Sequence, residues 1–410
     1  MSFDDAKKVI SLRLKPKPLG SELLGLLEAH NRVLAEEVES VLDIPPFNRS
    51  IVDGYAVKAA DTFGSDESNP AKLKVSGMVH IGESPTVSVG KGEVAEIVTG
   101  APIPEGADAV VMVENTDREK DVISVYGSVT PSENVMKKGS DIRKGSTVLK
   151  KGQVLGSREI GVLAALGKAQ IKVCRIPTVA VLSTGAEVTE PGEKLPAGKI
   201  YDINAYSLST AVLESGGKAV HAGVVPDEKA ELRAALERAL ASADMVITSG
   251  GVSVGPKDLM PQTAAALGKP GLIVCGVAVK PGKPMTVALV GEKPIFALPG
   301  HPTSALLMFH LLARPIIQVW AGRPARGNVA VKAVAGARLF SARGRRTFVM
   351  VKLKREAAER LVAEPVETGV SGAITTLAKA DGFVEVPANQ QFIDAEETVA
   401  VTLLKAASAD

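Results

Sequence analysis

The chain has 410 residues, a formal net charge of +2 and 45% hydrophobic residues, which is typical of a globular protein of about two to four domains. The near-neutral charge excludes the large basic excess that non-specific nucleic-acid binding requires, and a 3% aromatic content argues against modules that stack RNA bases. No apolar run reaches the ~20 residues of a membrane span, and the first residues lack the features of a secretory signal. We therefore expect a cytoplasmic protein that binds neither nucleic acid nor membrane.

The first part of the chain alternates between helical and β-rich patterns. Leucines recur at helical spacing between Leu12 and Val41, with Ser21 as a candidate N-cap, and predict a helical segment. A second predicted helix covers Ser157–Leu166. Between them, short alternating runs are bounded by Gly and Pro, which indicates a β-rich module inserted into a split helical domain.

From residue 178 to residue 320, apolar strands alternate with amphipathic helices. Helices are expected over Asn204–Glu214 and Glu228–Ala241, between the strand patterns TVAVLSTG, KAVHAGVVP and DMVITSGG. This alternation predicts a mainly parallel, doubly wound α/β sheet covered on both faces, and later β patterns predict a C-terminal β domain. The predicted domains are a split helical domain (1–44 with 140–176), an inserted β-rich domain (45–139), a central α/β domain (177–326) and a C-terminal β domain (327–410).

Two strands of the predicted sheet end in loops rich in Gly and small hydroxyls. These loops are Ser183-Thr184-Gly185 and Ser249-Gly250-Gly251, the latter followed by Ser253. Ligands of doubly wound sheets lie at the carboxyl ends of the strands, and glycine loops let backbone N–H groups approach a phosphate. Tight strand-to-helix turns are the alternative interpretation. Neither G-x-G-x-x-G nor P-loop spacing is present, so the dinucleotide and P-loop motifs are not supported.

Three carboxylates also follow predicted strands, namely Glu187, Asp227 and Asp258. They can converge on Mg²⁺, which takes one or two carboxylates together with phosphate oxygens. Helix N-caps or Asx-turns are an alternative role for Asp227 and Asp258. Considered together, the carboxylates and the glycine loops favour a metal–phosphate site.

Two proline–glycine turns follow the next strand patterns. Lys280-Pro-Gly-Lys283 comes at the end of a long apolar run that reads as one strand and places two ammonium groups near each other, although a solvated turn would carry lysines too. Pro299-Gly300-His301 opens a helix whose N-terminus can face an anion. His301 is a candidate acid or base, or a hydrogen-bonding residue. The histidines lack H-E-x-x-H spacing, so no zincin-type site is expected.

Cys174 and Cys275 each stand in an apolar stretch and are predicted to be small buried apolar residues.

Six segments carry a resemblance to a known family. In chain order they are PPFNRSIVDGYAV, VTGAPIPEGADAVVMVE, VLSTGAEV, ITSGGVSVGPKD, KPGKP and LPGHPTSA. Together they resemble the molybdopterin molybdenumtransferase family, which includes the gephyrin E-domain. The resemblance implies that molybdate is inserted into adenylyl-molybdopterin with Mg²⁺, releasing AMP and molybdenum cofactor; tungstate is an alternative oxyanion. It also implies an elongated homodimer with the site shared between subunits, and transient contact with other proteins of cofactor biosynthesis.

The resemblance assigns roles residue by residue. Catalytic roles fall on Asp53, Thr99, Glu187, Asp258 and Lys280. Metal-binding roles fall on Asp227 and Asp258. Substrate-binding roles fall on Ser183, Thr184, Gly185, Ser249, Gly250, Gly251, Ser253, Lys283, Pro299, Gly300 and Ser371.

Several positions depart from the family pattern. Met136 and Gly276 stand where relatives carry basic residues, Ala186 follows the first glycine loop in place of Asp, and His301 replaces Asn. The missing positive charge keeps two alternatives open. One is a noncatalytic molybdopterin-binding or scaffold paralogue. The other is a molybdopterin adenylyltransferase, an activity whose proteins resemble the α/β domain alone.

Overall fold

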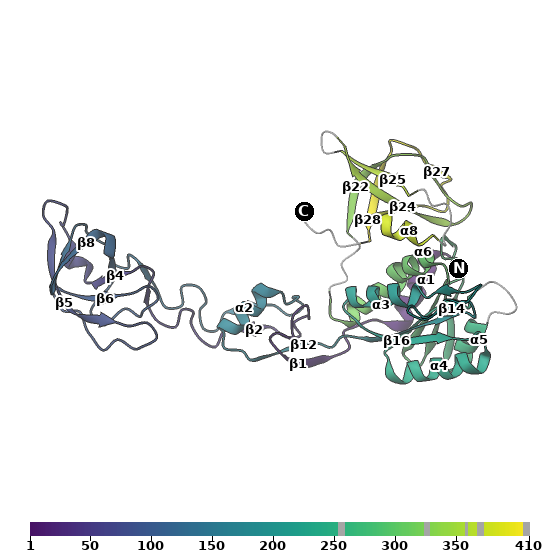
Figure 1. Cartoon of the computed structure of the whole chain (residues 1–410), viewed down its shortest axis with the longest axis horizontal. Coiled ribbons are helices and arrows are strands. Elements are labelled where there is room, and N and C mark those ends of the chain that lie inside the picture. Colours follow the sequence, from purple (N-terminus) through teal and green to yellow (C-terminus); the bar gives the residue numbers. More distant parts are fainter. Residues whose placement is uncertain (253–258, 324–328, 357–359, 367–372, 405–410) are drawn as a thin grey trace.

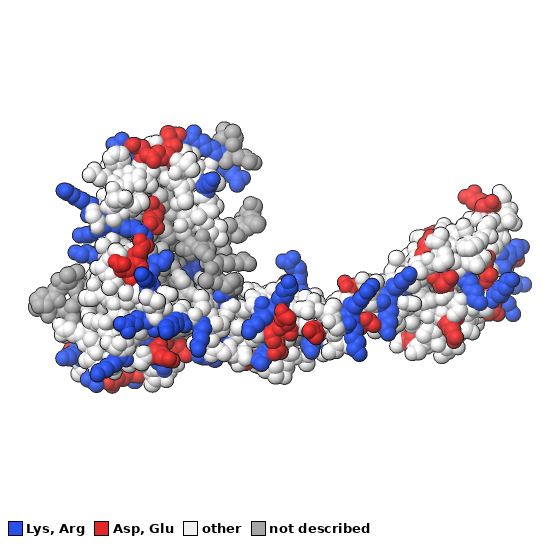
Figure 2. Space-filling view, turned by 180° about the vertical axis from the view of Figure 1, so that it is seen from behind, with Lys and Arg blue, Asp and Glu red and all other residues white. Residues whose placement is uncertain are grey.

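The computed structural model describes residues 1–252, 259–323, 329–356, 360–366 and 373–404. The molecule is elongated, with a β-rich module at one end, a small connecting module in the middle and the α/β and C-terminal domains at the other end (Figure 1). Acidic and basic side chains are interspersed along the face shown in Figure 2. Within the described ranges no helix is long and apolar enough to cross a membrane.

A six-stranded sheet forms the centre of the α/β domain, in the order β16-β13-β17-β21-β20-β18. Its strands are β13 (Thr178–Thr184), β16 (Lys218–Val225), β17 (Met245–Ser249), β18 (Pro270–Cys275), β20 (Thr286–Val290) and β21 (Lys293–Leu298). β13 pairs in parallel with β16 and β17, and β17 pairs in parallel with β21, whereas β20 is antiparallel to both of its neighbours. The predicted mainly parallel α/β sheet is confirmed. The carboxyl ends of β13, β17 and β21 therefore lie along one edge.

Helices cover both faces of this sheet. One face carries α4 (Lys229–Ser242) and α5 (Leu259–Ala266), whose apolar side chains pack against Leu182, Val246 and Ile295. The other face carries α1 (Phe3–Leu14), α3 (Asn204–Glu214), α6 (Pro302–Met308), a π-helical turn (Phe309–Ala313) and α7 (Arg314–Trp320). The structure confirms the two predicted helices of this domain to within one residue at each end.

The C-terminal domain is a sheet in the order β19-β24-β25-β22-β28-β26, which an additional pairing of β24 with β26 closes into a barrel. Its elements are β19 (Val279–Lys280), β22 (Ala330–Ala335), β23 (Leu339–Phe340), β24 (Arg346–Arg355), β25 (Leu361–Pro365), α8 (Ile374–Lys379), β26 (Gly382–Val386), β27 (Phe392–Ile393) and β28 (Thr398–Leu403). The expectation that one long strand runs up to Lys280 is wrong. The chain turns at Gly276, where φ is +68°, and Lys280 joins the C-terminal sheet through β24.

The inserted module is a separate six-stranded sheet in the order β7-β4-β6-β5-β9-β8. Its elements are β4 (Gly54–Val57), η1 (Ala59–Thr62), β5 (Ala71–Val79), β6 (Glu93–Ile97), β7 (Ala109–Met112), η2 (Val113–Asn115), β8 (Thr116–Glu119) and β9 (Val122–Val125). Two apolar clusters, one including Val57 and Val111 and the other including Ala56 and Val110, pack against it. Adjacent residues of one strand point to opposite faces, so the sheet is buried on both sides.

The connecting module corrects one prediction. Residues 12–41 are not a helical segment, because Ser21–Gly25 forms β1 and pairs antiparallel with β12 (Gln170–Cys174). Pairing with a distant strand overrides the helical spacing of the leucines. α1 ends at Leu14 and packs Phe3 into the α/β core. The module also contains β2 (Val38–Glu39), β11 (Thr147–Leu149) and α2 (Ser157–Ala165), the last within one residue of the prediction. β3 (Arg49–Ser50) pairs with β10 (Val135–Met136) beside the inserted module.

Candidate active site

The two glycine loops lie against each other at the carboxyl edge of the α/β sheet. Ser183 and Ser249 are register partners at the ends of β13 and β17. Gly250 has a φ of +96°, and a Cβ built on it would lie only 2.3 Å from the Thr184 carbonyl oxygen. Only glycine permits this approach, so the sequence brings the two loops into direct backbone contact.

Hydroxyl groups in these loops are buried without partners. Ser183 and Thr184 are 2% and 3% exposed, and neither hydroxyl forms a hydrogen bond to a described residue. Ser249 is also buried, but its Oγ donates to the Pro299 carbonyl at 3.1 Å. Buried polar atoms are normally hydrogen-bonded to protein or water. Unpaired hydroxyls at the carboxyl end of a strand therefore indicate a place where the polar groups of a ligand can bind.

Asn204 is a site residue that sequence reasoning missed. Its Nδ2 group donates to Ser249 Oγ at 2.8 Å and to the Gly300 carbonyl at 2.7 Å, while its Oδ1 atom is buried without a partner. One amide therefore connects the second glycine loop to the Pro299-Gly300 loop. The available signal was a polar residue at the first position of a helix, where Asn is usually explained as a cap.

Two of the predicted carboxylates face the glycine loops. A Cβ built on Gly185 would lie 2.6 Å from Glu187 Oε2, and one built on Gly251 would lie 3.7 Å from Asp227 Oδ1. Asp227 does not cap α4, because Glu228 takes the N-cap position. The predicted residues Ser253, Asp258 and Ser371 lie outside the described residues.

The described residues contain no group of three His, Cys, Asp or Glu side chains that would hold a metal by themselves. Mg²⁺ commonly binds through one or two carboxylates and completes its coordination with water and substrate phosphate oxygens. Asp227, beside the glycine loops and the unpaired hydroxyls of Ser183 and Thr184, fits a Mg²⁺ that is shared with a phosphate.

A cationic cavity of about 410 Å³ lies at the end of β18. Lys283 and Gly276 line it together with Arg343 and Arg345, which precede β24 of the C-terminal domain. The two arginines were not predicted, although the basic run ARGRR was visible. They supply positive charge to the cavity beside Gly276, a position where relatives carry a basic residue. Cys275 also lines the cavity and is exposed, so its expected burial is wrong, whereas Cys174 is buried as predicted.

Asp53 and Thr99 form a second, separate group on the inserted module. The Thr99 backbone N–H and Oγ1 both donate to Asp53 Oδ1, at 2.7 and 2.9 Å. These two bonds, the backbone one first, hold the pKa of Asp53 below its ordinary value. Within one chain the β4 and β6 end of the molecule lies far from α3 and β16 (Figure 1). The structure thus separates Asp53 and Thr99 from the predicted residues of the α/β domain.

The fold defines a multidomain α/β protein whose glycine loops meet at the carboxyl edge of its central sheet. Three family models match: "MoeA N-terminal region (domain I and II)" at residues 1–167, "Probable molybdopterin binding domain" at 180–319 and "MoeA C-terminal region (domain IV)" at 332–404. The chain is 35% identical to molybdopterin molybdenumtransferase 2 of Mycobacterium tuberculosis, covering 88% of this chain and 90% of that protein. It is 32% identical to the molybdopterin molybdenumtransferase of Bacillus subtilis, covering 94% and 90%.

Solved structures agree with these matches. The molybdopterin biosynthesis MoeA protein from Pyrococcus horikosii superposes with a TM-score of 0.85 at 41% identity, covering 99% of both chains. The chain therefore belongs to the MoeA family, and the resemblance found in its sequence motifs is confirmed.

Proposed function

We propose that this protein is a molybdopterin molybdenumtransferase that inserts molybdate into adenylyl-molybdopterin and releases AMP. The observation that carries the proposal is the contact between the two glycine loops, which places buried, unpartnered hydroxyls of Ser183 and Thr184 at the sheet edge. Relatives that bear this name match over 88% and 94% of the chain, and family models match its N-terminal and C-terminal regions. Full-length similarity argues against the adenylyltransferase alternative, whose proteins resemble the α/β domain alone.

The glycine loops bind the pterin and phosphate groups in this proposal. Gly250 and Gly251 present backbone N–H groups without a side chain in the way, and the Ser183 and Thr184 hydroxyls supply further hydrogen bonds. Asn204 holds Ser249 and the Gly300 loop at a fixed separation, so the phosphate contacts are arranged before the substrate arrives.

The cationic cavity is the entry site for molybdate in this proposal. Lys283, Arg343 and Arg345 surround a space large enough for a tetrahedral oxyanion. Guanidinium groups recognise oxyanions through two parallel hydrogen bonds, and positive charge neutralises charge that develops during transfer. The exposed Lys280 ammonium adds to this field from the adjoining β19.

Asp227 would hold Mg²⁺ together with substrate phosphate oxygens. When bound, the ion withdraws charge from the phosphoanhydride and makes AMP a better leaving group. The protein itself orients the phosphate through the glycine loops and the buried hydroxyls of Ser183 and Thr184.

A homodimer with a shared site completes the proposal. β4 and β6, which adjoin Asp53 and Thr99, lie at the opposite end of the molecule from α3 and β16 of the α/β domain, so a single chain separates the predicted catalytic residues (Figure 1). A partner chain that lies antiparallel would bring its inserted module to the α/β domain. The Asp53 carboxylate, held ionised by Thr99, would then face the substrate as an acceptor.

The test uses the purified full chain with adenylyl-molybdopterin, molybdate and Mg²⁺, and measures AMP and molybdenum cofactor. We expect AMP release that depends on molybdate, and a loss of about tenfold or more in kcat/KM for Thr184→Val, because a phosphate hydrogen bond is removed. Thr263→Val is the matched control, since Thr263 is also buried with an unpaired hydroxyl but lies on α5.

Two results would assign another function. ATP-dependent formation of adenylyl-molybdopterin from molybdopterin would identify an adenylyltransferase. Tight binding of adenylyl-molybdopterin without AMP release would identify a noncatalytic binding or scaffold protein. Repeating the assay with tungstate determines the oxyanion preference.

A further inference from the structure

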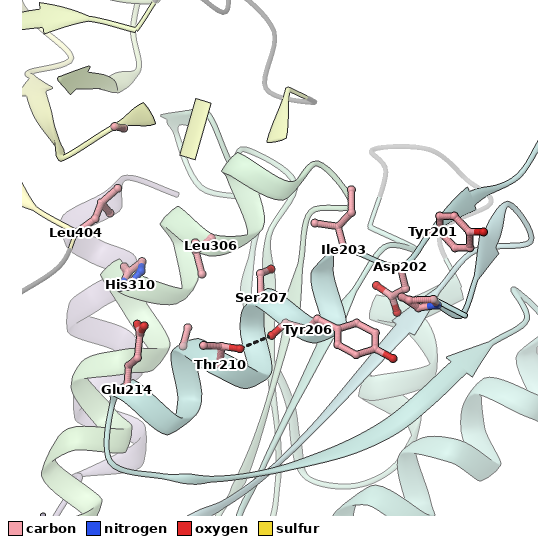
Figure 3. Close-up of a pocket in the computed structure, with 13 residues that line it drawn as sticks. Tyr201, Asp202, Ile203, Tyr206, Ser207, Thr210, Glu214, Leu306, His310 and Leu404 are labelled. Atoms are coloured by element: carbon pink, nitrogen blue, oxygen red, sulfur yellow. Dashed lines mark hydrogen bonds between the residues drawn. The ribbon is translucent and has the colours of Figure 1, made fainter. Parts of the chain in front are cut away.

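A second cavity, of about 670 Å³, lies between α3, α6 and the C-terminal domain. Figure 3 shows α3 side chains on one side of it, Leu306 and His310 from the α6 region on another, and Leu404 from the C-terminal domain. No residue assigned above to pterin, phosphate, Mg²⁺ or molybdate lines this cavity. A space of this size is in the range that small organic ligands occupy in proteins.

The charge of the cavity differs in sign from that of the active site. Its lining contains the carboxylates of Asp202 and Glu214 and the rings of Tyr201 and Tyr206, but no Lys or Arg among the described residues. A polyanionic pterin phosphate would be repelled here. The cavity is therefore not an extension of the phosphate site.

Asp202 supplies the strongest indication of a ligand. It is only 5% exposed, and its Oδ1 atom accepts the Ala205 backbone N–H at 3.0 Å, at the start of α3. Its Oδ2 atom is buried without a hydrogen-bond partner among the described residues. A buried carboxylate oxygen is stable when a donor, preferably a charged one, reaches it.

Glu214 and His310 define the other end of the cavity. His310 is 6% exposed, and its Nδ1 atom lies 3.4 Å from the Arg314 guanidinium, which also attracts Glu214. Because a guanidinium only donates, His310 Nδ1 acts as acceptor and Nε2 carries the proton. Among the described residues neither Glu214 nor Asp202 forms an ion pair, but Glu214 is attracted by the nearby Arg314 charge.

We propose that this cavity binds a small organic cation with an apolar or aromatic body, its amine placed at Asp202. Tyr206 offers a ring face beside Asp202, where a cation is attracted by the π electrons. Ala211, Leu306 and Leu404 provide the apolar surface that an aromatic or aliphatic body requires.

The test is calorimetric titration of the full chain with tryptamine, and with indole-3-propionate as an anionic probe of similar shape. Tryptamine should bind at one site per chain. The Kd of indole-3-propionate should be at least about tenfold higher, and a tenfold difference corresponds to ~1.4 kcal/mol of binding free energy. Asp202→Asn should weaken tryptamine binding by about tenfold. The Asn side-chain oxygen can still accept the Ala205 backbone N–H, so the fold is kept. Leu306→Phe, whose larger side chain fills part of the cavity, should weaken the binding of both probes. Glu231→Gln, an exposed change on α4, is the charge control.

Several results would overturn the proposal. No tryptamine binding to the wild-type chain, equal binding of the two probes, or an unchanged affinity in Asp202→Asn would each do so. The comparison of probes uses only wild-type protein, so it stands even where a variant folds poorly. Light scattering on the same samples measures whether tryptamine changes the oligomeric state. If tryptamine binds only when the oligomer dissociates, a second chain covers the cavity and the proposal is wrong.

Discussion

Asn204 Nδ2 donates to Ser249 Oγ over 2.8 Å, although 45 positions separate the two residues. The same amide reaches the Gly300 carbonyl at 2.7 Å, so the first residue of α3 fixes the distance between the loops after β17 and β21. Its free Oδ1 atom is buried at the same edge. The residue therefore fixes the position of the two loops, and in the proposed function its Oδ1 atom is an acceptor for the substrate.

The first prediction removes this amide. Asn204→Ala should lower the free energy of unfolding by about 1–3 kcal/mol, because a buried hydrogen-bond network loses its donor. It should also lower kcat/KM for AMP release by about tenfold or more, since the loops lose their fixed separation. Asn115→Ala, at an exposed position of the inserted module, is the control. An Asn204→Ala enzyme with activity within about twofold of wild type would remove Asn204 from the site.

The second prediction concerns the contact between the glycine loops. Gly250 and Gly223 both have positive φ, +96° and +81°, but a Cβ on Gly250 meets the Thr184 carbonyl whereas one on Gly223 meets nothing within 4 Å. Both Gly→Ala changes carry the same left-handed strain of about 1–2 kcal/mol. Gly250→Ala should therefore destabilise by about 1–3 kcal/mol more than Gly223→Ala in urea unfolding. Equal destabilisation would show that the loops separate easily.

Much of the fold could be predicted because the sequence patterns that specify its strands and helices are local. β13, β17 and the helices α3 and α4 have continuous apolar patterns bounded by Gly or polar residues, and they form where expected. The prediction for residues 12–41 failed because Leu23 and Leu24 pair with the distant β12, and no local pattern carries that information.

The site was predictable only where its residues stand together in the sequence. The glycine loops are recognisable as motifs, and their contact follows from parallel pairing. Arg343 and Arg345 line one cavity with Lys283 only because the C-terminal domain packs against this edge of the α/β domain. Asn204, on α3, acts through a hydrogen bond to Ser249 at the end of β17. Such relationships depend on tertiary structure, so they are absent from any short pattern.

The third prediction tests the cationic cavity. Arg345→Ala should raise the KM for molybdate roughly fivefold, about 1 kcal/mol, with a smaller effect on kcat, because a charge-assisted contact to the oxyanion is lost. Lys332→Ala, an exposed change on β22 of the same domain, is the matched control for net charge. The effect should shrink with added salt. An unchanged KM for molybdate in Arg345→Ala would place the oxyanion elsewhere.

The fourth prediction tests the shared site by complementation. Asp53→Asn and Asp227→Asn should each be inactive, but a mixed dimer has one site that carries neither change. Co-refolded or co-expressed variants should therefore recover about a quarter of wild-type activity if subunits mix at random. The control mixes Asp53→Asn with Thr99→Val, because both changes lie in the same group and leave every mixed site defective. Recovery in the control, or none in the test pair, would contradict a site shared in this way.

The fifth prediction concerns the pH dependence of stability through His310. Burial, with a smaller contribution from the Arg314 charge, lowers the pKa of His310 from 6.5 to about 4. The folded state therefore favours the neutral imidazole. The contribution of His310 to the free energy of unfolding is complete above pH 6.5. It declines as the pH falls from 6.5 toward 4, because over this range the unfolded chain binds a proton that the folded chain does not. A shift of this size corresponds to roughly 3 kcal/mol. In denaturant unfolding between pH 4 and 8, His310→Gln should lose less stability on acidification than the wild type, whereas the exposed His80→Gln should follow the wild-type profile. Parallel profiles for His310→Gln and wild type would mean that folding does not lower the pKa of His310.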